Sequence, residues 1–429
     1  MVITKRGLVL GTTAVALSTV AVTGAGIHLS QSQAFFQDSP KEIVDEVWQI
    51  INYQYVDQDF NNTDWLEIRK EFLEKSYTDK QEAYEAIRQM LEKLEDPYTR
   101  FMDPEEFKNM QIDTSGELTG VGIQISKDEE TDRLLVVAPI EDTPAFEAGI
   151  LAKDLIISID GTDTKGMDVN DAVKLIRGKP GTSVTLTIER NGQKNNYQIE
   201  RANITIHPVK ARIENTPIGQ VGYIRLTQFS AQASQEMRDT IKNFEEKSVA
   251  GYVLDLRSNP GGLLYSSIDI ARMWLNEGTI VSTVGRQGES DRKSANKNAL
   301  TNKPLVVLID GGSASASEIL SGALQDNHRA TLIGTQTFGK GLVQSVRSLG
   351  DGSGLAVTIA KYLTPSGRDI NKEGIPPDIV IELSETERKE LQSDIKLIGT
   401  AKDPQFTKAM EILSQEVQAQ GRESSQATK

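Results

Sequence analysis

The spacing of apolar residues changes along the chain and divides it into regions. Up to about residue 112, apolar positions recur at helical spacing, as in Tyr84, Ile87, Leu91 and Leu94. Asp96-Pro97 ends this helix, because proline lacks an amide proton and disfavours a helical residue before it. We therefore predict a helical N-terminal region over residues 38–112.

In residues 114–205 the apolar positions recur at a shorter spacing. Residues 120–125 and 183–190 alternate in the manner of strands, and residues 170–177 form a helix that Gly178 ends. Strands and short helices alternate over the whole segment, which predicts one compact domain.

Longer apolar runs mark residues 206–385. Residues 250–257 and 303–310 predict strands buried on both faces, and each run is followed by a helix. This alternation predicts a β/α core with a largely parallel sheet. Residues 386–429 form a polar helical tail, so the fold class is a multidomain α+β / α/β chain.

Composition narrows the function classes. Of 429 residues, 38% are hydrophobic and 25% charged, and the net charge of −14 argues against nucleic-acid binding. The chain has no cysteine and three histidines, which excludes thiolate chemistry and argues against a histidine-rich zinc site. We predict neither a metal nor a cofactor.

The N-terminus predicts export. Lys5 and Arg6 precede an apolar stretch from Gly7 to Ile27, and residues 32–34 (SQA) form an acceptable cleavage site. We predict a signal peptide over residues 1–34. The alternative is an uncleaved membrane anchor, since roughly 20 apolar residues span a bilayer.

A serine and a lysine are the main candidates for chemistry. Ser315 follows a buried strand and precedes a helix, and Lys340 lies between Gly339 and Gly341. A lysine replaces histidine as a base when its pKa falls from about 10.4 toward about 7, as burial can impose. Taken singly, Ser315 is more simply a helix cap and Lys340 a surface turn residue.

A glycine pair supplies candidate amide donors. Gly261 and Gly262 lie between a buried strand and a helix, where free amides face a nearby anion. The amides of Gly261 and Ala316 are our candidates for holding an oxyanion.

Together these segments resemble the carboxyl-terminal processing peptidases, exported serine proteases with a PDZ domain. The resemblance covers nearly the whole chain after the leader. The matching motifs are DPYTRFMDPEEF (96–107), TGVGIQI (119–125), DLRSNPGGLL (255–264), SASASEI (313–319), TFGKGLVQS (337–345) and GRDINKEGIPPDI (367–379). The resemblance implies a PDZ domain over residues 114–205 and a ClpP/crotonase-like protease core over residues 206–385.

The resemblance also assigns roles. Ser315 aligns with the nucleophile, Lys340 with the general base, and Gln344 with a glutamine that orients the lysine amine. Gly261 and Ala316 align with the oxyanion hole. Asp326 aligns with an acidic position near the site, although a structural role at a helix end is the favoured interpretation. A triad of Ser315, Asp326 and His328 is a weaker rival.

In the PDZ domain, Gly120, Val121, Gly122 and Ile123 align with the loop and strand that bind a peptide carboxylate. A simple glycine hairpin is the alternative. Arg177 aligns with an arginine linked to activation in some relatives, and a surface ion pair is the competing interpretation.

We therefore predict an exported endopeptidase that recognises exposed C-terminal tails of proteins and cleaves near them. The alternatives are a catalytically silent PDZ scaffold and, by fold analogy alone, a crotonase-like thioester enzyme. The predicted location is the periplasm or the thylakoid lumen, with membrane association if the leader is retained. The terminal helical regions are candidates for pairing copies of the chain into a homo-oligomer.

Overall fold

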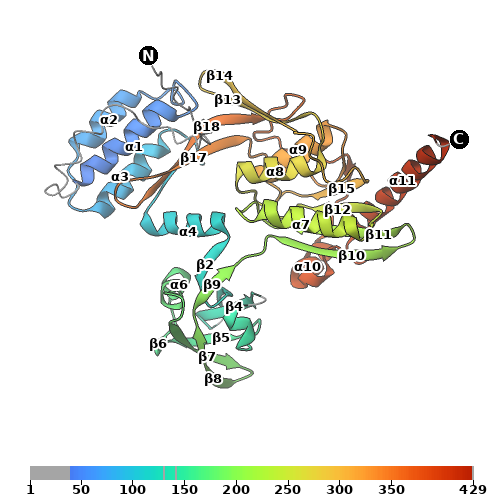
Figure 1. The fold of residues 1–429 in the computed structure, drawn as a ribbon. Helices are drawn as coiled ribbons and strands as arrows, with labels where there is room; N and C mark the ends of the chain where they lie inside the picture. Colours follow the sequence, from blue (N-terminus) through green and yellow to red (C-terminus); the bar gives the residue numbers. More distant parts are fainter. Residues whose placement is uncertain (1–38, 129–130, 141–142, 428–429) are drawn as a thin grey trace, which may run out of the picture.

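The computed structural model describes residues 39–128, 131–140 and 143–427, and Figure 1 shows how its parts are arranged. A helical bundle and a larger core lie at opposite ends, and a small domain lies below them and is connected to them through two strands. The predicted leader, residues 1–34, lies outside the described residues. Within these ranges, no helix is both long enough and apolar enough to cross a membrane.

The N-terminal part is a bundle of three helices. These are α1 (Pro40–Gln54), α2 (Trp65–Glu74) and α3 (Lys80–Glu92). Helix α3 begins where the Asp79 carboxylate accepts the backbone N–H of Glu82. Stacked rings of Trp48, Phe60 and Trp65 belong to the bundle core.

The predicted helical region also contains a strand. Strand β1 (Arg100–Met102) follows the proline stop and pairs antiparallel with β18 (Gly354–Leu363), which satisfies its backbone groups. Helix α4 (Pro104–Ser115) then starts with a capping box between Asp103 and Glu106. A local apolar pattern cannot reveal such a strand, because its partner lies about 250 residues away.

The small domain has the predicted alternation of strands and helices. Its elements are β2 (Glu117–Gly120), β3 (Ile123–Asp128), β4 (Arg133–Pro139), α5 (Pro144–Glu147), β5 (Leu155–Ile159), β6 (Thr162–Asp163), α6 (Val169–Ile176), β7 (Ser183–Arg190), β8 (Gln193–Glu200) and β9 (Ala202–Thr205). The main sheet has the order β3-β4-β5-β7-β8, with β6 on β5. Strands β2 and β9 pair with each other, so the chain enters and leaves the domain side by side.

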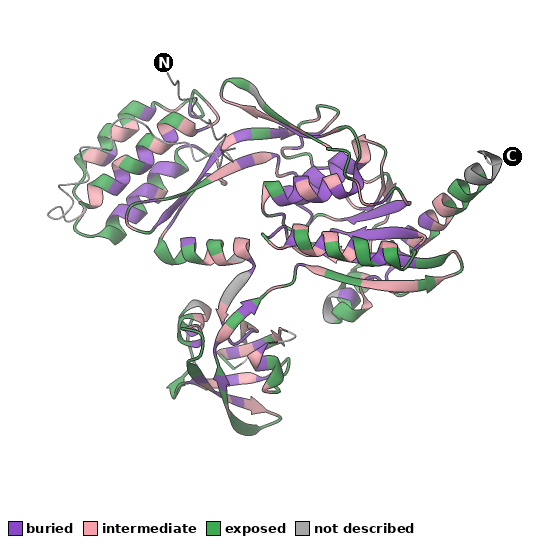
Figure 2. Cartoon of the chain, viewed as in Figure 1, coloured by how far each residue is buried: buried purple, intermediate pink, exposed green. Residues whose placement is uncertain are grey.

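The core contains a six-stranded sheet in the order β10-β11-β12-β15-β16-β19. Its strands and the helices between them are β10 (Val209–Thr216), β11 (Gly219–Leu226), α7 (Ala233–Glu246), β12 (Gly251–Asp255), α8 (Leu264–Trp274), β15 (Leu305–Ile309), α9 (Ala316–Asp326), β16 (Thr331–Gly334) and β19 (Ile379–Val380). All neighbours from β11 to β19 run parallel, and β10 is antiparallel to β11. Every residue of β12 and β15 is buried, as the continuous apolar runs predict (Figure 2).

Both faces of this sheet are covered. Leu254 and Val307 pack in one cluster with α7, α8 and α9, whereas Val253 and Val306 pack against α11 (Pro404–Ala427). The tail also contains α10 (Glu385–Ser393) and the short η1 (Ile395–Leu397). The predicted multidomain fold class, with its β/α core and helical tail, is confirmed.

A second sheet joins the core to the N-terminal bundle. Its order is β1-β18-β13-β14, with β17 also paired to β18. Its remaining strands are β13 (Thr279–Gly285), β14 (Gly288–Ser294) and β17 (Leu342–Ser348). Leu355 of β18 packs in the bundle, while Tyr362 of the same strand packs in the core. This sheet positions the loop that carries Lys340, which directly precedes β17.

Candidate active site

Ser315 lies where the chain turns from β15 into α9. Its backbone has φ 54° and ψ −110°, in the left-handed range of φ that non-glycine residues rarely adopt. Such a conformation costs about 1–3 kcal/mol and persists only where the surroundings impose it. A strained turn from a strand into a helix is the arrangement expected for a nucleophile.

A buried carboxylate joins the two predicted catalytic segments. Glu318 lies in the first turn of α9 and is fully buried. Its Oε2 accepts the backbone N–H groups of Ser315 (2.8 Å) and Lys340 (2.9 Å). Its Oε1 accepts the N–H of Gly339 (2.7 Å) and the hydroxyl of Thr337 (2.6 Å). Four donors stabilise one buried charge, and they hold the serine turn against the lysine loop.

The surroundings of Lys340 favour its uncharged form. Burial lowers the pKa of the Lys340 amine, and the nearby positive charge of Arg100 lowers that pKa further. The carboxylates of Asp96 and Glu318 act in the opposite direction without reversing the shift. The amine also lies over the ring of Tyr98, with Nζ 5.0 Å from the ring centroid.

The segments of the predicted base and nucleophile lie close together, but the two side chains are not hydrogen-bonded to each other. No hydrogen bond joins Lys340 Nζ to Ser315 Oγ in the part of the chain that the structure describes. Gln344 lies in β17 at an irregularity in the pairing with β18. Its Nε2 is buried and has no hydrogen-bond partner among the described residues. The amide group therefore has unused hydrogen-bonding capacity.

Gly261 packs directly against the serine turn. Its φ is 100°, and a Cβ at this position would lie 2.6 Å from the Ala314 carbonyl oxygen and 2.9 Å from the Ala316 nitrogen. Only glycine fits such a close approach. The structure thus brings Gly261 and Ala316 together. The N–H of Gly261 donates to Oδ1 of Asn259 at 2.9 Å.

Asp326 and His328 lie at the far end of α9 from Ser315. The helix has 11 residues, and at about 1.5 Å per residue it separates its ends by about 16 Å. The histidine triad is therefore wrong.

Asp326 instead holds a neighbouring loop. It accepts the backbone N–H of Ser366 at 2.9 Å and pairs with Arg368. Burial raises the Asp326 pKa, but hydrogen bonds from Thr364 and Ser366 outweigh it and lower the pKa overall. These contacts agree with the structural interpretation of this residue.

The glycine loop of the small domain is not a hairpin. Strand β2 before it pairs with β9, and β3 after it pairs with β4. Gly122 has φ 81°, and a Cβ there would lie 2.3 Å from the Thr143 hydroxyl. Buried Val121 accepts the N–H of Ala145 through its carbonyl (2.8 Å). The loop leads into β3, which is an edge strand with one side open to pairing.

Arg177 contacts helix α4. Its guanidinium donates to Oδ1 of Asn109 in α4 at 2.6 Å. Nearby, Lys174 forms an ion pair with Glu105 of the same helix at 3.0 Å. Arg177 is thus part of a contact between the small domain and α4, through a neutral amide rather than a carboxylate.

The sequence analysis missed three residues of the site: Glu318, Tyr98 and Asn259. Glu318 had a local signal, because Ser315 followed by Glu318 has the spacing of a capping box. Tyr98 and Asn259 act through contacts that no local pattern contains.

Comparisons with known proteins agree with this geometry. Residues 220–381 match Peptidase family S41, and residues 135–190 match a PDZ domain. The chain is 44% identical over 404 residues to a carboxyl-terminal-processing protease of Synechocystis sp., covering 93% of each. It is 37% identical to a chloroplastic C-terminal processing peptidase of Tetradesmus obliquus, covering 84% of this chain and 81% of that one.

A solved structure named photosystem II D1 C-terminal processing protease is also similar. Its TM-score is 0.57 at 36% sequence identity, and the match covers 86% of this chain and 99% of that one. The matches extend over both the PDZ domain and the core. The chain therefore belongs to peptidase family S41, as a serine-type carboxyl-terminal-processing protease with a PDZ domain.

Proposed function

We propose that Ser315 is the nucleophile and Lys340 the general base of this protease. The observation that carries the proposal is the Glu318 carboxylate, which binds the backbone of both residues at once. Burial lowers the pKa of Lys340, which favours the neutral amine that a base requires.

The reaction then proceeds through an acyl-enzyme. Lys340 Nζ takes the hydroxyl proton of Ser315 while Oγ forms a bond to the scissile carbonyl carbon. The oxyanion is held by the amides of Gly261 and Ala316. When the C–N bond breaks, the leaving amine takes the proton from Lys340. Water then hydrolyses the ester and regenerates the Ser315 hydroxyl.

Substrate binding completes this arrangement. Lys340 Nζ moves from the ring of Tyr98 to Ser315 Oγ, and the free amide of Gln344 binds the amine there. A neutral amide orients the amine without adding a negative charge that would raise its pKa. The Gly261 amide shares its donation between Asn259 and the oxyanion.

The PDZ domain recognises the substrate's C-terminal tail. The amides of residues 120–123 bind the terminal carboxylate, and the tail adds as a strand to the open edge of β3, beside α6. The tight contact of Gly122 with Thr143 supports a loop of fixed shape at this place. The silent-scaffold alternative is not favoured, because close relatives are named as proteases.

The relatives also suggest where the protein acts. They come from a cyanobacterium and from a chloroplast, and one similar structure is named for processing the photosystem II D1 protein. Together with the sequence of residues 1–34, this supports an exported enzyme of the thylakoid lumen or periplasm. Its substrates are precursors with an exposed C-terminal tail.

Cleavage of tailed peptides tests the proposal. Peptides with a free or an amidated C-terminus are incubated with the parent protein and with Ser315→Ala, Lys340→Ala and the control Lys361→Ala, and products are identified by mass spectrometry. Only the parent and the control should cleave, and the free carboxylate should be preferred. Cleavage by Ser315→Ala or Lys340→Ala at the parent rate would refute the mechanism. Tail binding without cleavage by the parent would support the scaffold.

A further inference from the structure

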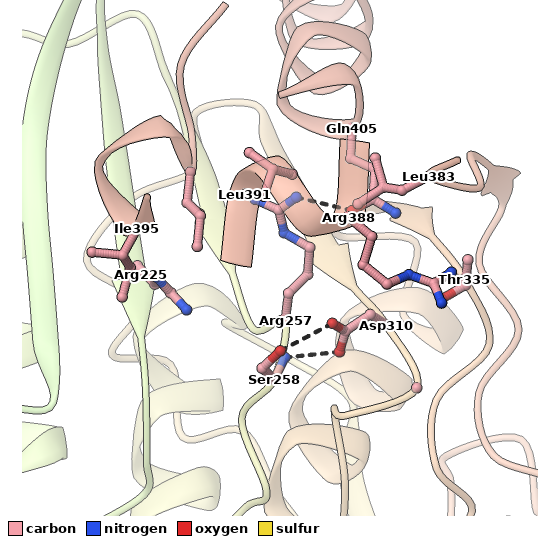
Figure 3. A pocket seen from close by; sticks show the side chains of 12 residues that line it. Arg225, Arg257, Ser258, Asp310, Thr335, Leu383, Arg388, Leu391, Ile395 and Gln405 are labelled. Carbon is pink, nitrogen blue, oxygen red and sulfur yellow. Dashed lines mark hydrogen bonds between the residues drawn. The ribbon is translucent and has the colours of Figure 1, made fainter. Parts of the chain in front are cut away.

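A cavity of about 510 Å³ lies behind the serine turn, at the carboxyl ends of β11, β12, β15 and β16 (Figure 3). The strand ends contribute Arg225, Ser258, Asp310 and Thr335 to its wall. The tail segment with α10 and η1 covers the other side. None of the predicted catalytic or peptide-binding residues lines this cavity, so it is separate from the active site. Its volume is in the range of small-molecule binding sites.

The cavity has unpaired positive charge. The charge of Arg257 is already neutralised, because its guanidinium pairs with Asp255 (2.6 Å) and Asp403 (2.7 Å). Arg225 and Arg388 flank it in Figure 3, and neither has an ion pair within the described ranges. The Nε of Arg225 is buried and has no hydrogen-bond partner there. A buried charged donor without a partner is costly, so an anion in the cavity would be stabilised.

The carboxylate in the wall does not neutralise these arginines. Asp310 accepts the N–H groups of Ser258 (2.8 Å) and Gly312 (2.9 Å), and also the Ser258 hydroxyl (3.2 Å). Oδ1 is therefore directed to the backbone of the neighbouring loops, and Oδ2 accepts the Ser258 hydroxyl.

The opposite wall is apolar. It is formed by Leu383, Leu391, Ile395 and Ile398. Ile395 is 66% exposed in this structure, whereas Leu391 is 7% exposed. A ligand that covers this wall gains from burial of apolar surface, while a purely ionic ligand does not. The wall thus favours an anion attached to an apolar body.

We propose that this cavity binds a carboxylate carried by a compact apolar body. Arg225 binds the carboxylate through its buried Nε, the exposed Arg388 adds positive charge on the other side of Arg257, and the leucine and isoleucine side chains cover the apolar part. The source is either the end of a short peptide, which a peptidase produces, or a free short-chain acid. An occupant also contacts Ser258 and Asp310, which precede Gly261 and Ser315, so it lies against the back of both loops of the active site.

Calorimetric titration of the full chain with Ser315→Ala tests the proposal without turnover. The probes are sodium hexanoate, N-acetyl-leucyl-leucine and its C-terminal amide. Arg225→Gln should weaken carboxylate binding by about tenfold or more, as expected for loss of a hydrogen bond to a charged group. Arg388→Gln should weaken it less, because it removes positive charge from an exposed side chain. The control Arg238→Gln removes an arginine of α7 that has no partner among the described residues, and should leave binding unchanged.

The probes distinguish the two sources. Hexanoate binding that depends on Arg225 and Arg388 assigns the site to free acids. Peptide binding with that dependence, without hexanoate binding, assigns it to peptide ends. Any binding to the PDZ domain should persist in both arginine variants.

Equal binding of acid and amide, or equal affinity in all three arginine variants, would overturn the proposal. Arg388 is exposed, so Arg388→Gln keeps the test valid even if Arg225→Gln destabilises the fold.

Discussion

The serine side and the lysine side of the active site differ in how completely they are formed. On the serine side, the φ of Ser315, the close approach of Gly261 and the bonds of Glu318 fix the backbone. On the lysine side the backbone is also held, but the amine of Lys340 lies on Tyr98 and the amide of Gln344 has no partner. The comparison shows that the backbone of the site is fixed on both sides, while the side chains of Lys340 and Gln344 are not hydrogen-bonded to Ser315.

The position of each side explains the difference. Ser315 follows a buried strand of the core sheet. The apolar side chains around it are closely packed and cannot rearrange without a loss of packing energy. Lys340 lies at the start of the sheet that connects the core to the N-terminal bundle, near residues of both. Its surroundings therefore depend on how two parts of the protein meet.

Removing the Glu318 carboxylate should have the largest effect, because it acts on both sides. Glu318→Gln turns two amide hydrogens toward backbone donors and leaves several of them unpaired. We expect the free energy of unfolding to fall by about 2–4 kcal/mol and the cleavage rate by roughly a hundredfold or more. Denaturant unfolding measures the free energy of unfolding, and a peptide assay measures the cleavage rate. The exposed Glu382→Gln should change neither, and a fully active Glu318→Gln would show that the two segments need no link.

A methyl group at Gly261 should damage the serine side alone. In Gly261→Ala the new Cβ meets the Ala314 carbonyl at 2.6 Å, which should cost about 1–3 kcal/mol of stability. The cleavage rate should fall with it. Gly311→Ala is the matched control, because its Cβ would meet nothing closer than 3.9 Å and should change stability by less than about 0.5 kcal/mol. Equal effects of the two substitutions would contradict the close packing described above.

Replacing Gln344 should separate activity from stability on the lysine side. Gln344→Leu removes a buried amide without a partner, so stability should rise by about 1 kcal/mol. The cleavage rate should fall by about tenfold if the amide orients Lys340. Gln344→Glu adds a negative charge, which should raise the Lys340 pKa and move the rise of activity to higher pH. An unchanged rate in Gln344→Leu would remove Gln344 from the mechanism.

Arg100 should give the smallest effect, seen in the pH profile. Activity rises with pH as Lys340 loses its proton, and the charge of Arg100 lowers that pKa. Arg100→Gln should therefore raise the pKa and shift the rise of activity upward by a few tenths of a pH unit, less at high salt because Arg100 is exposed. Arg347→Gln serves as the control. A shift to lower pH would contradict the assignment of Lys340 as the base.

The sequence by itself determined the buried strands of the core, the helices after them and the family. Continuous apolar runs predicted β12 and β15, because a strand buried on both faces has no room for polar positions. Helix α9 (Ala316–Asp326) follows β15 as predicted, since the start and end signals of a helix are local. The motifs around Ser315 and Lys340 indicated the family, which the comparisons confirm.

Only the tertiary structure decided how the site is assembled. Strand β1 forms because its backbone pairs with that of β18. Tyr98 contacts Lys340 only in the folded chain. The role of Glu318 also depends on the loop at residues 337–340, although its cap spacing is visible in the sequence. Such contacts join residues far apart in the chain, and burial and charge then act on groups whose neighbours no local pattern specifies.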